Sequence, residues 1–447
     1  MMRPWAVAAV WSLVPGPALA HASDRAVILT LPTGPYIWGA GLAVALTALV
    51  AAFGGRLPAF GARRLCVRPA ILPRSATSWL AAITLFALIC AGLFGSHNPL
   101  ANPLPLMLWT VIWVGLTIAC AAFGNLWRDI DPWTGPVRTL RGRLGRKAGI
   151  GLARLGHWPA AGGLLAFSWF EIVALSPDDP AQLAVILAVY WLVIFALAVA
   201  EGEDWLQHGE FLTVFFGYIA RIAPFWAVYD TDRVTVMRGW PGAQIPALPP
   251  LGPSAAAFVT LMLASVSFDG LHQTFRWLAL TGINPLEYPG RSAVTGMNTA
   301  GLLAMWALMA GLITAATPGA RRGPVMLSFL TIAAGYHIAH YLVALLTMGQ
   351  YAIAALDDPL QRGHHLLGLP DHWVSFGFLS RESAVARIWQ AQWVIILCAH
   401  MSSVVLAARL GADSGGLRKN LAKIPLALLM VLYTVFGLWL LSAPAVG

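Results

Sequence analysis

Six side chains that could carry acid–base or metal chemistry lie inside or at the edge of long apolar runs of this sequence. They are two carboxylic acids and four histidines, namely Glu171, Asp269, His272, His337, His340 and His400. An acid at the centre of a membrane helix costs roughly 2.5–3.5 kcal/mol, so such groups are kept mainly where they are paired or used. Several of the six are expected at a similar depth, which predicts one polar site inside a bundle of membrane helices.

The spacing of four of these side chains pairs them on helix faces. Asp269 and His272 are three residues apart, and so are His337 and His340. Residues with this spacing share one face of a helix. Carboxylate and histidine pairs on facing helices are how helical bundles assemble metal sites. Without thiolate ligands, such a set suits Zn(II), Mn(II), Fe(II) or Cu(II), and a bound metal could turn water into a hydroxide nucleophile.

The same residue types also serve other purposes in membranes. Facing histidines ligate haem b, and chains of acids and histidines carry protons or ions. Polar side chains also hydrogen-bond from one membrane helix to another without further function. The pair formed by His337 and His340 lacks the general base of a His-Glu-x-x-His motif, because Ile338 and Ala339 stand between them. The residues alone therefore leave a metal site, a haem site, an ion pathway and a structural network open.

The elements that must position these side chains are membrane helices. Mean hydropathy is +0.71, and 58% of the 447 residues are hydrophobic against 11% charged. Apolar stretches of membrane length recur along the chain, which predicts an all-α, polytopic transmembrane bundle. We expect about ten spans, near 36–54, 78–96, 104–124, 158–176, 181–200, 253–277, 298–316, 324–349, 388–408 and 424–443.

Basic residues decide the expected topology. The formal charge of +9 is concentrated in short loops between spans, so a lipid bilayer and not a nucleic acid is the expected partner. With the N-terminus outside, the loops at 56–77, 127–157 and 409–423 are all cytoplasmic only if the apolar stretch 211–227 does not cross. That stretch is therefore predicted to be re-entrant or interfacial, and the loop at 351–387 to be periplasmic, in a bacterial inner membrane.

Residues 1–20 are predicted to be a secretory signal peptide. Arg3 provides a basic start, a short apolar stretch follows, and Ala18-Leu19-Ala20 supplies the small residues of a cleavage site. Cleavage there would make His21 the first residue of a single polytopic membrane domain, residues 21–447.

Short motifs from the third predicted span onward carry a resemblance to a known family. They are Asn125-Leu126-Trp127, Asp131-Pro132-Trp133, Ala220-Arg221-Ile222-Ala223-Pro224, Ser267-Phe268-Asp269-Gly270, Ala339-His340-Tyr341, Gly349-Gln350, Asp358-Pro359-Leu360, Trp389 with Gln392, His400, and Gly437-Leu438-Trp439-Leu440-Leu441. Together they resemble the membrane-integrated fenitrothion hydrolase family, although that family usually reads Asn-Pro-Trp where this chain has Asp131-Pro132-Trp133. The resemblance implies an organophosphorus triester hydrolase that can form a complex with a second membrane protein. It gives weight to Asp269, His340 and His400.

The leading hypothesis combines these observations. A divalent metal held by Asp269, His340 and His400, with His337 or His272 as a further ligand, would activate water for attack on an apolar phosphotriester-type substrate. Glu171 would be the general base, and Asp269 the second catalytic carboxylate. The alternatives are a non-enzymatic transporter or metal-handling membrane protein, and a haem b membrane protein.

Overall fold

The computed structural model describes residues 33–53, 61–69, 72–230, 233–317, 322–370, 372–410 and 424–443. The predicted signal peptide, with His21 after it, lies outside these residues, and so does most of the predicted loop 409–423.

The protein is a mostly helical, multi-pass membrane protein. Eight helices in the described ranges are long and apolar enough to cross a membrane. They are α3 (Arg74–Phe94), the continuous helix Pro103–Phe123 (α4, Pro103–Pro105; η2, Leu106–Leu116; α5, Thr117–Phe123), α9 (Pro180–Glu201), α12 (Pro253–His272), α14 (Arg291–Ala316), the pair α15 (Arg322–Met326) and α16 (Phe329–Asp357), α17 (Glu382–Leu410) and α19 (Ile424–Ser442).

Two further predicted spans also form helices. These are α2 (Thr33–Phe53) and α8 (Trp158–Val173), the second of which has only 16 residues. Shorter elements connect the long helices: α6 (Trp127–Ile130), α7 (Thr134–Arg143), η3 (Leu152–Leu155), η4 (Glu203–Trp205), α10 (Leu206–Gly209), α11 (Phe211–Ile219), η5 (Ala220–Ile222), η6 (Ile245–Ala247), α13 (Phe275–Leu280) and η7 (Pro285–Glu287).

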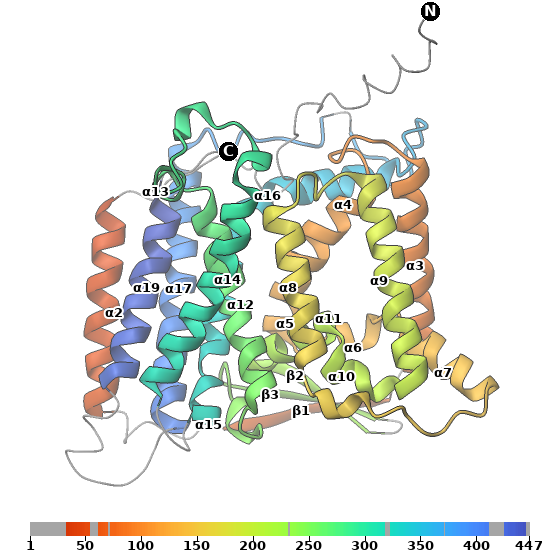
Figure 1. Cartoon of the computed structure of the whole chain (residues 1–447), viewed down its shortest axis with the longest axis horizontal. Helices are drawn as coiled ribbons and strands as arrows, with labels where there is room; N and C mark the ends of the chain where they lie inside the picture. The colour runs from red at the N-terminus through yellow and green to blue at the C-terminus, as the bar shows by residue number, and fades with distance from the viewer. Residues whose placement is uncertain are drawn as a thin grey trace, which may run out of the picture.

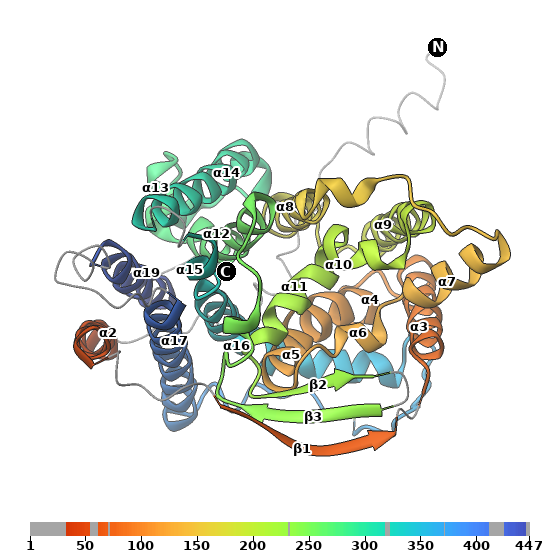
Figure 2. The ribbon, with the colours of Figure 1, turned by 90° about the horizontal axis from the view of Figure 1, so that it is seen from below.

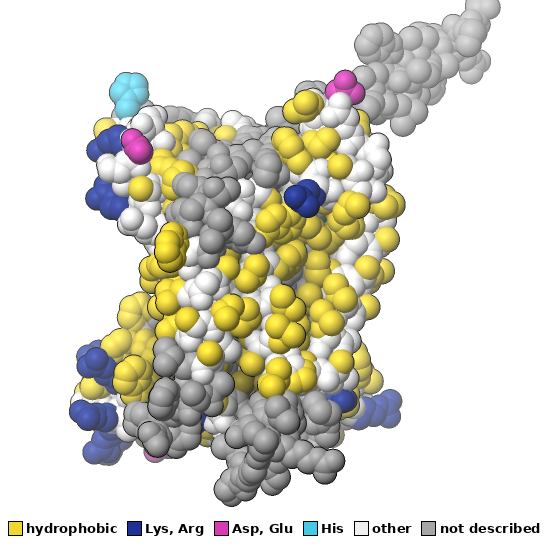
Figure 3. Space-filling view, turned by 90° about the vertical axis from the view of Figure 1, so that its left-hand side faces the viewer, with side chains coloured by type: hydrophobic (Ala, Val, Ile, Leu, Met, Phe, Trp, Pro, Cys, Tyr) yellow, Lys and Arg dark blue, Asp and Glu magenta, His cyan; other side chains and the backbone are white. Residues whose placement is uncertain are grey.

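The long helices stand side by side in the bundle (Figure 1). The face shown in Figure 3 carries hydrophobic side chains over its middle, with charged side chains toward both ends. Large side chains such as Leu80 (63% exposed), Leu308 (51%) and Leu432 (55%) point outward from three different helices. In water this surface would be strongly unfavourable, whereas it fits the hydrocarbon of a bilayer.

The stretch predicted to be re-entrant or interfacial forms α11, which has nine residues. At about 1.5 Å per residue this helix extends roughly 14 Å, less than half of a hydrocarbon layer about 30 Å thick. Glu210 caps its start by accepting hydrogen bonds from the backbone N–H groups of Leu212 and Thr213. Phe215 and Phe216 are buried, so protein surrounds much of the helix. Pro224 then ends the helical path, and strand β2 follows.

A small sheet is the element that the all-α prediction missed. Strands β1 (Ala62–Pro69), β2 (Phe225–Tyr229) and β3 (Arg233–Gly239) pair antiparallel in the order β1-β3-β2. The sheet lies across the lower end of the bundle (Figure 2). Gly124 ends the helix Pro103–Phe123 at φ 89°, and a side chain there would come within 3.0 Å of Trp226 on β2. The sequence predicted a basic loop here. The alternation of arginines with apolar residues in β1 extends over too few residues to indicate a strand.

The connecting segments separate to the two ends of the bundle. The sheet and α7 lie at one end, and α13 lies at the other with the segment that joins α16 to α17 (Figure 1). The predicted cytoplasmic segments around 62–69 and 134–143 therefore share an end. Between the two ends, α12 and the α15–α16 pair are the most enclosed of the eight long helices. In these two, 67% and 72% of an 18-residue apolar stretch is buried. These helices carry most of the residues singled out from the sequence.

Candidate functional site

Asp269 is the centre of a hydrogen-bonded cluster inside the bundle. It stands one turn before the end of α12, and its side chain is 10% exposed. His340 Nε2 lies 2.9 Å from Asp269 Oδ2, and the Tyr341 hydroxyl lies 2.5 Å from the same oxygen. His340 and Tyr341 are neighbours on α16, so one carboxylate oxygen holds two consecutive side chains of the facing helix. The predicted proximity of Asp269 and His340 is therefore found in the structure.

Glu171 extends this cluster to a third helix. Its carboxyl oxygen Oε1 lies 3.0 Å from the Tyr341 hydroxyl, and the residue is 3% exposed. Tyr341 thus stands between the carboxyl groups of α8 and α12. We call Glu171, Asp269, His340 and Tyr341 the acid–base network. Sequence reasoning did not assign a role to Tyr341, although its position one turn after His337 puts both residues on one helix face.

Arg291 is a second residue that sequence reasoning missed. It begins α14, and its Nη1 lies 3.0 Å from the backbone carbonyls of Glu171 and Ala174, at the end of α8. The last carbonyls of a helix have no partner within that helix, and a cation there also suits the helix dipole. Arg291 therefore fixes the turn that holds Glu171.

His272 and His337 flank the network but bond to backbone carbonyls. His272 Nδ1 lies 2.7 Å from the carbonyl of Asp269, one turn back on the same helix, and 3.9 Å from Asp269 Oδ1. His337 Nε2 lies 2.9 Å from the carbonyl of Trp113 in the π-helical segment η2. The ring of His337 packs 4.8 Å from that of Tyr341. These histidines thus connect the network to its surroundings.

Gly270 provides space between α12 and α16. A side-chain carbon at this position would lie 2.7 Å from the Tyr336 hydroxyl and 3.6 Å from His340. A side chain of α16 therefore uses the space that this glycine provides. Tyr336 packs its ring against that of His340 at 6.0 Å.

His400 lies in a different hydrogen-bonded group. Its Nε2 is 2.7 Å from the Thr47 hydroxyl on α2, and its Nδ1 is 2.7 Å from the Thr434 hydroxyl on α19. The side chain is fully buried on α17. We call His400, Thr47 and Thr434 the threonine clamp, because these three residues join three helices. The expected convergence of His400 with Asp269 and His340 does not occur.

The donor atoms do not fit a metal ion as the sequence suggested. Both ring nitrogens of His400 bond to threonine hydroxyls, and Nε2 of His340 bonds to Asp269. Nδ1 of His272 and Nε2 of His337 bond to backbone carbonyls. Within the described ranges, no group of three or more His, Cys, Asp or Glu side chains is placed to hold a metal ion. The metal and the haem both stay predictions, and no chemical step below is derived through either.

The acid–base network combines features that suit proton transfer. His340 has 24% of its side chain exposed, whereas Glu171 is almost fully enclosed. A phenol has one proton and donates it to one acceptor at a time. Because Tyr341 contacts two carboxyl groups, its second contact is favourable when one carboxyl group carries a proton. The network thus contains a base oriented by a carboxylate, together with a nearby site for a stored proton.

Comparison with known proteins gives no assignment. No protein-family description matches the chain, and neither the curated proteins nor the solved structures contain a match.

Proposed function

We propose that the acid–base network is the reaction site of an integral membrane hydrolase acting on apolar, phosphotriester-type substrates. The observation that supports it most is the double contact at Asp269 Oδ2, where His340 and Tyr341 bond to one carboxylate oxygen at 2.9 and 2.5 Å. A carboxylate that orients a histidine, with the histidine still accessible, is the arrangement that general-base catalysis uses. The substrate class comes from the resemblance to fenitrothion hydrolases.

In this proposal His340 is the base that activates water. Its Nε2–H donates to Asp269, which leaves Nδ1 as the nitrogen that accepts a proton. As the water oxygen forms a bond to phosphorus, its proton passes to Nδ1, and the bond from phosphorus to the leaving oxygen breaks. The proton on His340 then passes to the leaving group. The products are a phosphodiester and an alcohol or phenol, so atoms and charge balance.

Glu171 takes a more distant role than the direct base that the sequence suggested. It reaches Asp269 only through Tyr341, with the hydroxyl 3.0 Å from Glu171 Oε1 and 2.5 Å from Asp269 Oδ2. A proton stored on Glu171 keeps the Tyr341 proton directed at Asp269. Asp269 then stays ionised and stabilises the imidazolium form of His340 while the reaction proceeds.

The membrane setting supports this substrate class. We infer ten spans, which are the eight long helices together with α2 and α8, and a non-crossing α11, in a bacterial inner membrane. In that topology the end of α12 that bears Asp269 lies in the periplasmic half. An apolar triester dissolves in hydrocarbon, so it can reach such a site from the bilayer. A second membrane subunit, as the resemblance implies, would assemble on the apolar outer surface.

A direct assay tests the proposal. The purified full chain in lipid nanodiscs is given an aryl dialkyl phosphotriester, and release of the phenol is followed by absorbance. We expect hydrolysis above that of empty nanodiscs, and a loss of about 10²–10⁴-fold for Asp269→Asn, which removes the charge that orients His340. Wild-type protein no faster than empty nanodiscs would contradict the hydrolase. Metal content of the same sample, measured by elemental analysis, tests the metal prediction separately.

Proton or ion transport is the second candidate, and the position of Tyr341 favours it. The Tyr341 hydroxyl lies between the carboxyl groups of Glu171 and Asp269. Such a hydroxyl can pass a proton from one carboxyl group to another within a membrane. Proteoliposomes with a trapped pH dye would then acidify faster than empty vesicles after a pH jump, and Glu171→Gln would abolish the difference. Equal rates with and without the protein would remove this candidate.

A further inference from the structure

A large cavity lies apart from the acid–base network, between α8 and α9. Its volume is about 530 Å³, in the range that binds small molecules in proteins. Its walls come from α3, α8, α9, α11 and the helix Pro103–Phe123. Helix α8 packs on α11 and α12, whereas α9 packs on α3, so the two helices diverge around the cavity.

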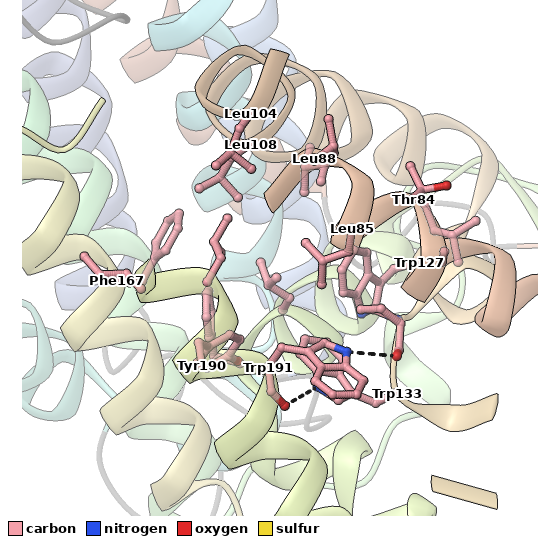
Figure 4. A pocket seen from close by; sticks show the side chains of 18 of the residues that line it. Thr84, Leu85, Leu88, Leu104, Leu108, Trp127, Trp133, Phe167, Tyr190 and Trp191 are labelled. Carbon is pink, nitrogen blue, oxygen red and sulfur yellow. Dashed lines mark hydrogen bonds between the residues drawn. The ribbon is translucent and has the colours of Figure 1, made fainter. Parts of the chain in front are cut away.

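The walls of this cavity are mostly apolar, and the polar hydrogens of their side chains already have acceptors. Figure 4 shows two tryptophans bonded to backbone carbonyls, with Trp133 Nε1 3.1 Å from the carbonyl of Trp191 and Trp191 Nε1 3.1 Å from that of Pro132. The Tyr190 hydroxyl donates to Glu210, and the Trp127 indole donates to Thr213.

The lining threonines are used in the same way. The hydroxyls of Thr77 and Thr84 donate to carbonyls of their own helix, those of Arg74 and Leu80. A polar ligand would lose its hydrogen bonds to water here and meet no free donor among these side chains. The lining of the cavity therefore favours a hydrocarbon ligand.

The cavity opens sideways, toward the surface that we assign to lipid. Two of its lining side chains, Leu80 on α3 and Ile186 on α9, are 63% and 36% exposed. The same two helices expose Ile83 (61%) and Val189 (55%) close by. Hydrocarbon that enters from this side therefore comes from the bilayer.

A basic segment lies at one end of the helices that flank this opening. Helix α7 packs against both α3 and α9 (Figure 1). Residues 134–157 contain six basic residues and no acidic one. Within the described part of the chain, Arg143, Arg146 and Lys147 are exposed and have no ion pair. Clusters of this kind attract anionic lipid headgroups.

We propose that this cavity binds one acyl chain of an anionic membrane phospholipid, with the headgroup held at the basic segment that begins with α7. The site is separate from the acid–base network and does not depend on the proposed hydrolysis.

Photolabelling of the full chain in vesicles tests this site. The probe is phosphatidylglycerol with a diazirine at the end of one acyl chain, and labelled peptides are identified by mass spectrometry. We expect label enriched on cavity-lining peptides of α8 and α9 over the exposed face of α14. Ala166→Phe, on the α8 wall, fills the cavity and should lower the cavity label at least about fivefold, because a packed ring and the chain cannot share the space. Ala81→Phe, from α3, repeats the test should the first variant not fold.

The matched control is Val193→Phe, the same added ring on the outer face of α9, where Val193 is 51% exposed and does not line the cavity. It should leave the cavity label unchanged.

The headgroup assignment has its own test. Phosphatidylcholine with the same diazirine should label the cavity less than phosphatidylglycerol does, and Arg143→Gln with Arg146→Gln should remove this preference for the anionic lipid. Cavity peptides labelled no more than α14, or insensitive to both cavity-filling variants, would overturn the acyl-chain site. Equal labelling by the two lipids would overturn the headgroup assignment.

Discussion

Two histidines inside the helical bundle of this protein have different hydrogen-bond partners. His340 bonds to the carboxylate of Asp269, which also contacts a phenol and, through it, a second carboxyl group. His400 bonds to the hydroxyls of Thr47 and Thr434, with no carboxyl group in its hydrogen bonds. His340 keeps 24% of its side chain exposed, whereas His400 is fully buried.

The difference separates a polar group that can be satisfied without a change of protonation from one that has room for a proton. A histidine between two hydroxyls donates one hydrogen bond and accepts another, so the threonine clamp is satisfied while every member is neutral. It joins α2, α17 and α19 and needs no proton to come or go. In the acid–base network two carboxyl groups share one phenol proton, so the network has room for an added proton. In our proposal the first arrangement stabilises packing, and the second stores and releases protons.

The largest expected effect sharpens the comparison within the acid–base network. Asp269→Asn and His340→Gln should each lower the rate of phosphotriester hydrolysis about 10²–10⁴-fold, and the double variant should be no slower than either single one, since the two residues act as one unit. Initial rates in nanodiscs measure this. Multiplicative losses in the double variant would show that Asp269 and His340 act independently.

A smaller effect is expected where the network reaches Glu171. Tyr341→Phe removes the hydroxyl that links the two carboxyl groups, and Glu171→Gln removes one of the acids it joins. Each should lower the hydrolysis rate by roughly tenfold, and combining them should add little, because either change breaks the same link. A Glu171→Gln loss as large as that of Asp269→Asn would instead restore Glu171 as the direct base.

The threonine clamp should respond in stability and not in rate. His400→Leu keeps an apolar side chain of similar size but removes two cross-helix hydrogen bonds, which costs about 1–2 kcal/mol in membrane proteins. We expect a lower midpoint of thermal unfolding in detergent, with the hydrolysis rate at low temperature within about twofold of wild type. Loss of activity in folded His400→Leu protein would break the distinction between the two groups.

The smallest effect is expected at Arg291, which holds the end of α8 and not a reacting atom. Arg291→Lys keeps the charge but removes the guanidinium whose Nη1 contacts the carbonyls of Glu171 and Ala174. The hydrolysis rate should fall by roughly twofold to fivefold through movement of Glu171, and Tyr341→Phe should remove most of that sensitivity. Hydrolysis rates of wild type, the two single variants and the double variant measure this dependence.

Much of the fold could be predicted from the sequence, because a segment that crosses hydrocarbon as a helix must be long and apolar. Each of the ten predicted spans contains a helix, and the apolar stretch after Glu210 forms only the short α11. The sheet could not be predicted, because β1 pairs with a strand more than 150 residues away. Nothing local in Ala62–Pro69 reveals that partner.

The candidate site was predicted in part, for a related reason. Spacing along one helix placed Asp269 with His272 and His337 with His340, and the structure brings Asp269 and His340 together. Spacing says nothing about which helices face each other, and His400, which was grouped with Asp269, bonds to Thr47 and Thr434 instead. Tyr341 was missed because a tyrosine beside a histidine is ordinary in an apolar helix. Only its contact with two carboxyl groups makes it distinctive.

The most direct test applies one substitution to both of these histidines. His340→Gln and His400→Gln are prepared in the same nanodiscs, and phosphotriester hydrolysis is measured against the folded fraction of each. We predict that His340→Gln loses at least about 10²-fold in rate while folded, and that folded His400→Gln hydrolyses within about twofold of wild type. Equal rates for the two folded variants would contradict the assignment of chemistry to the acid–base network and of packing to the threonine clamp.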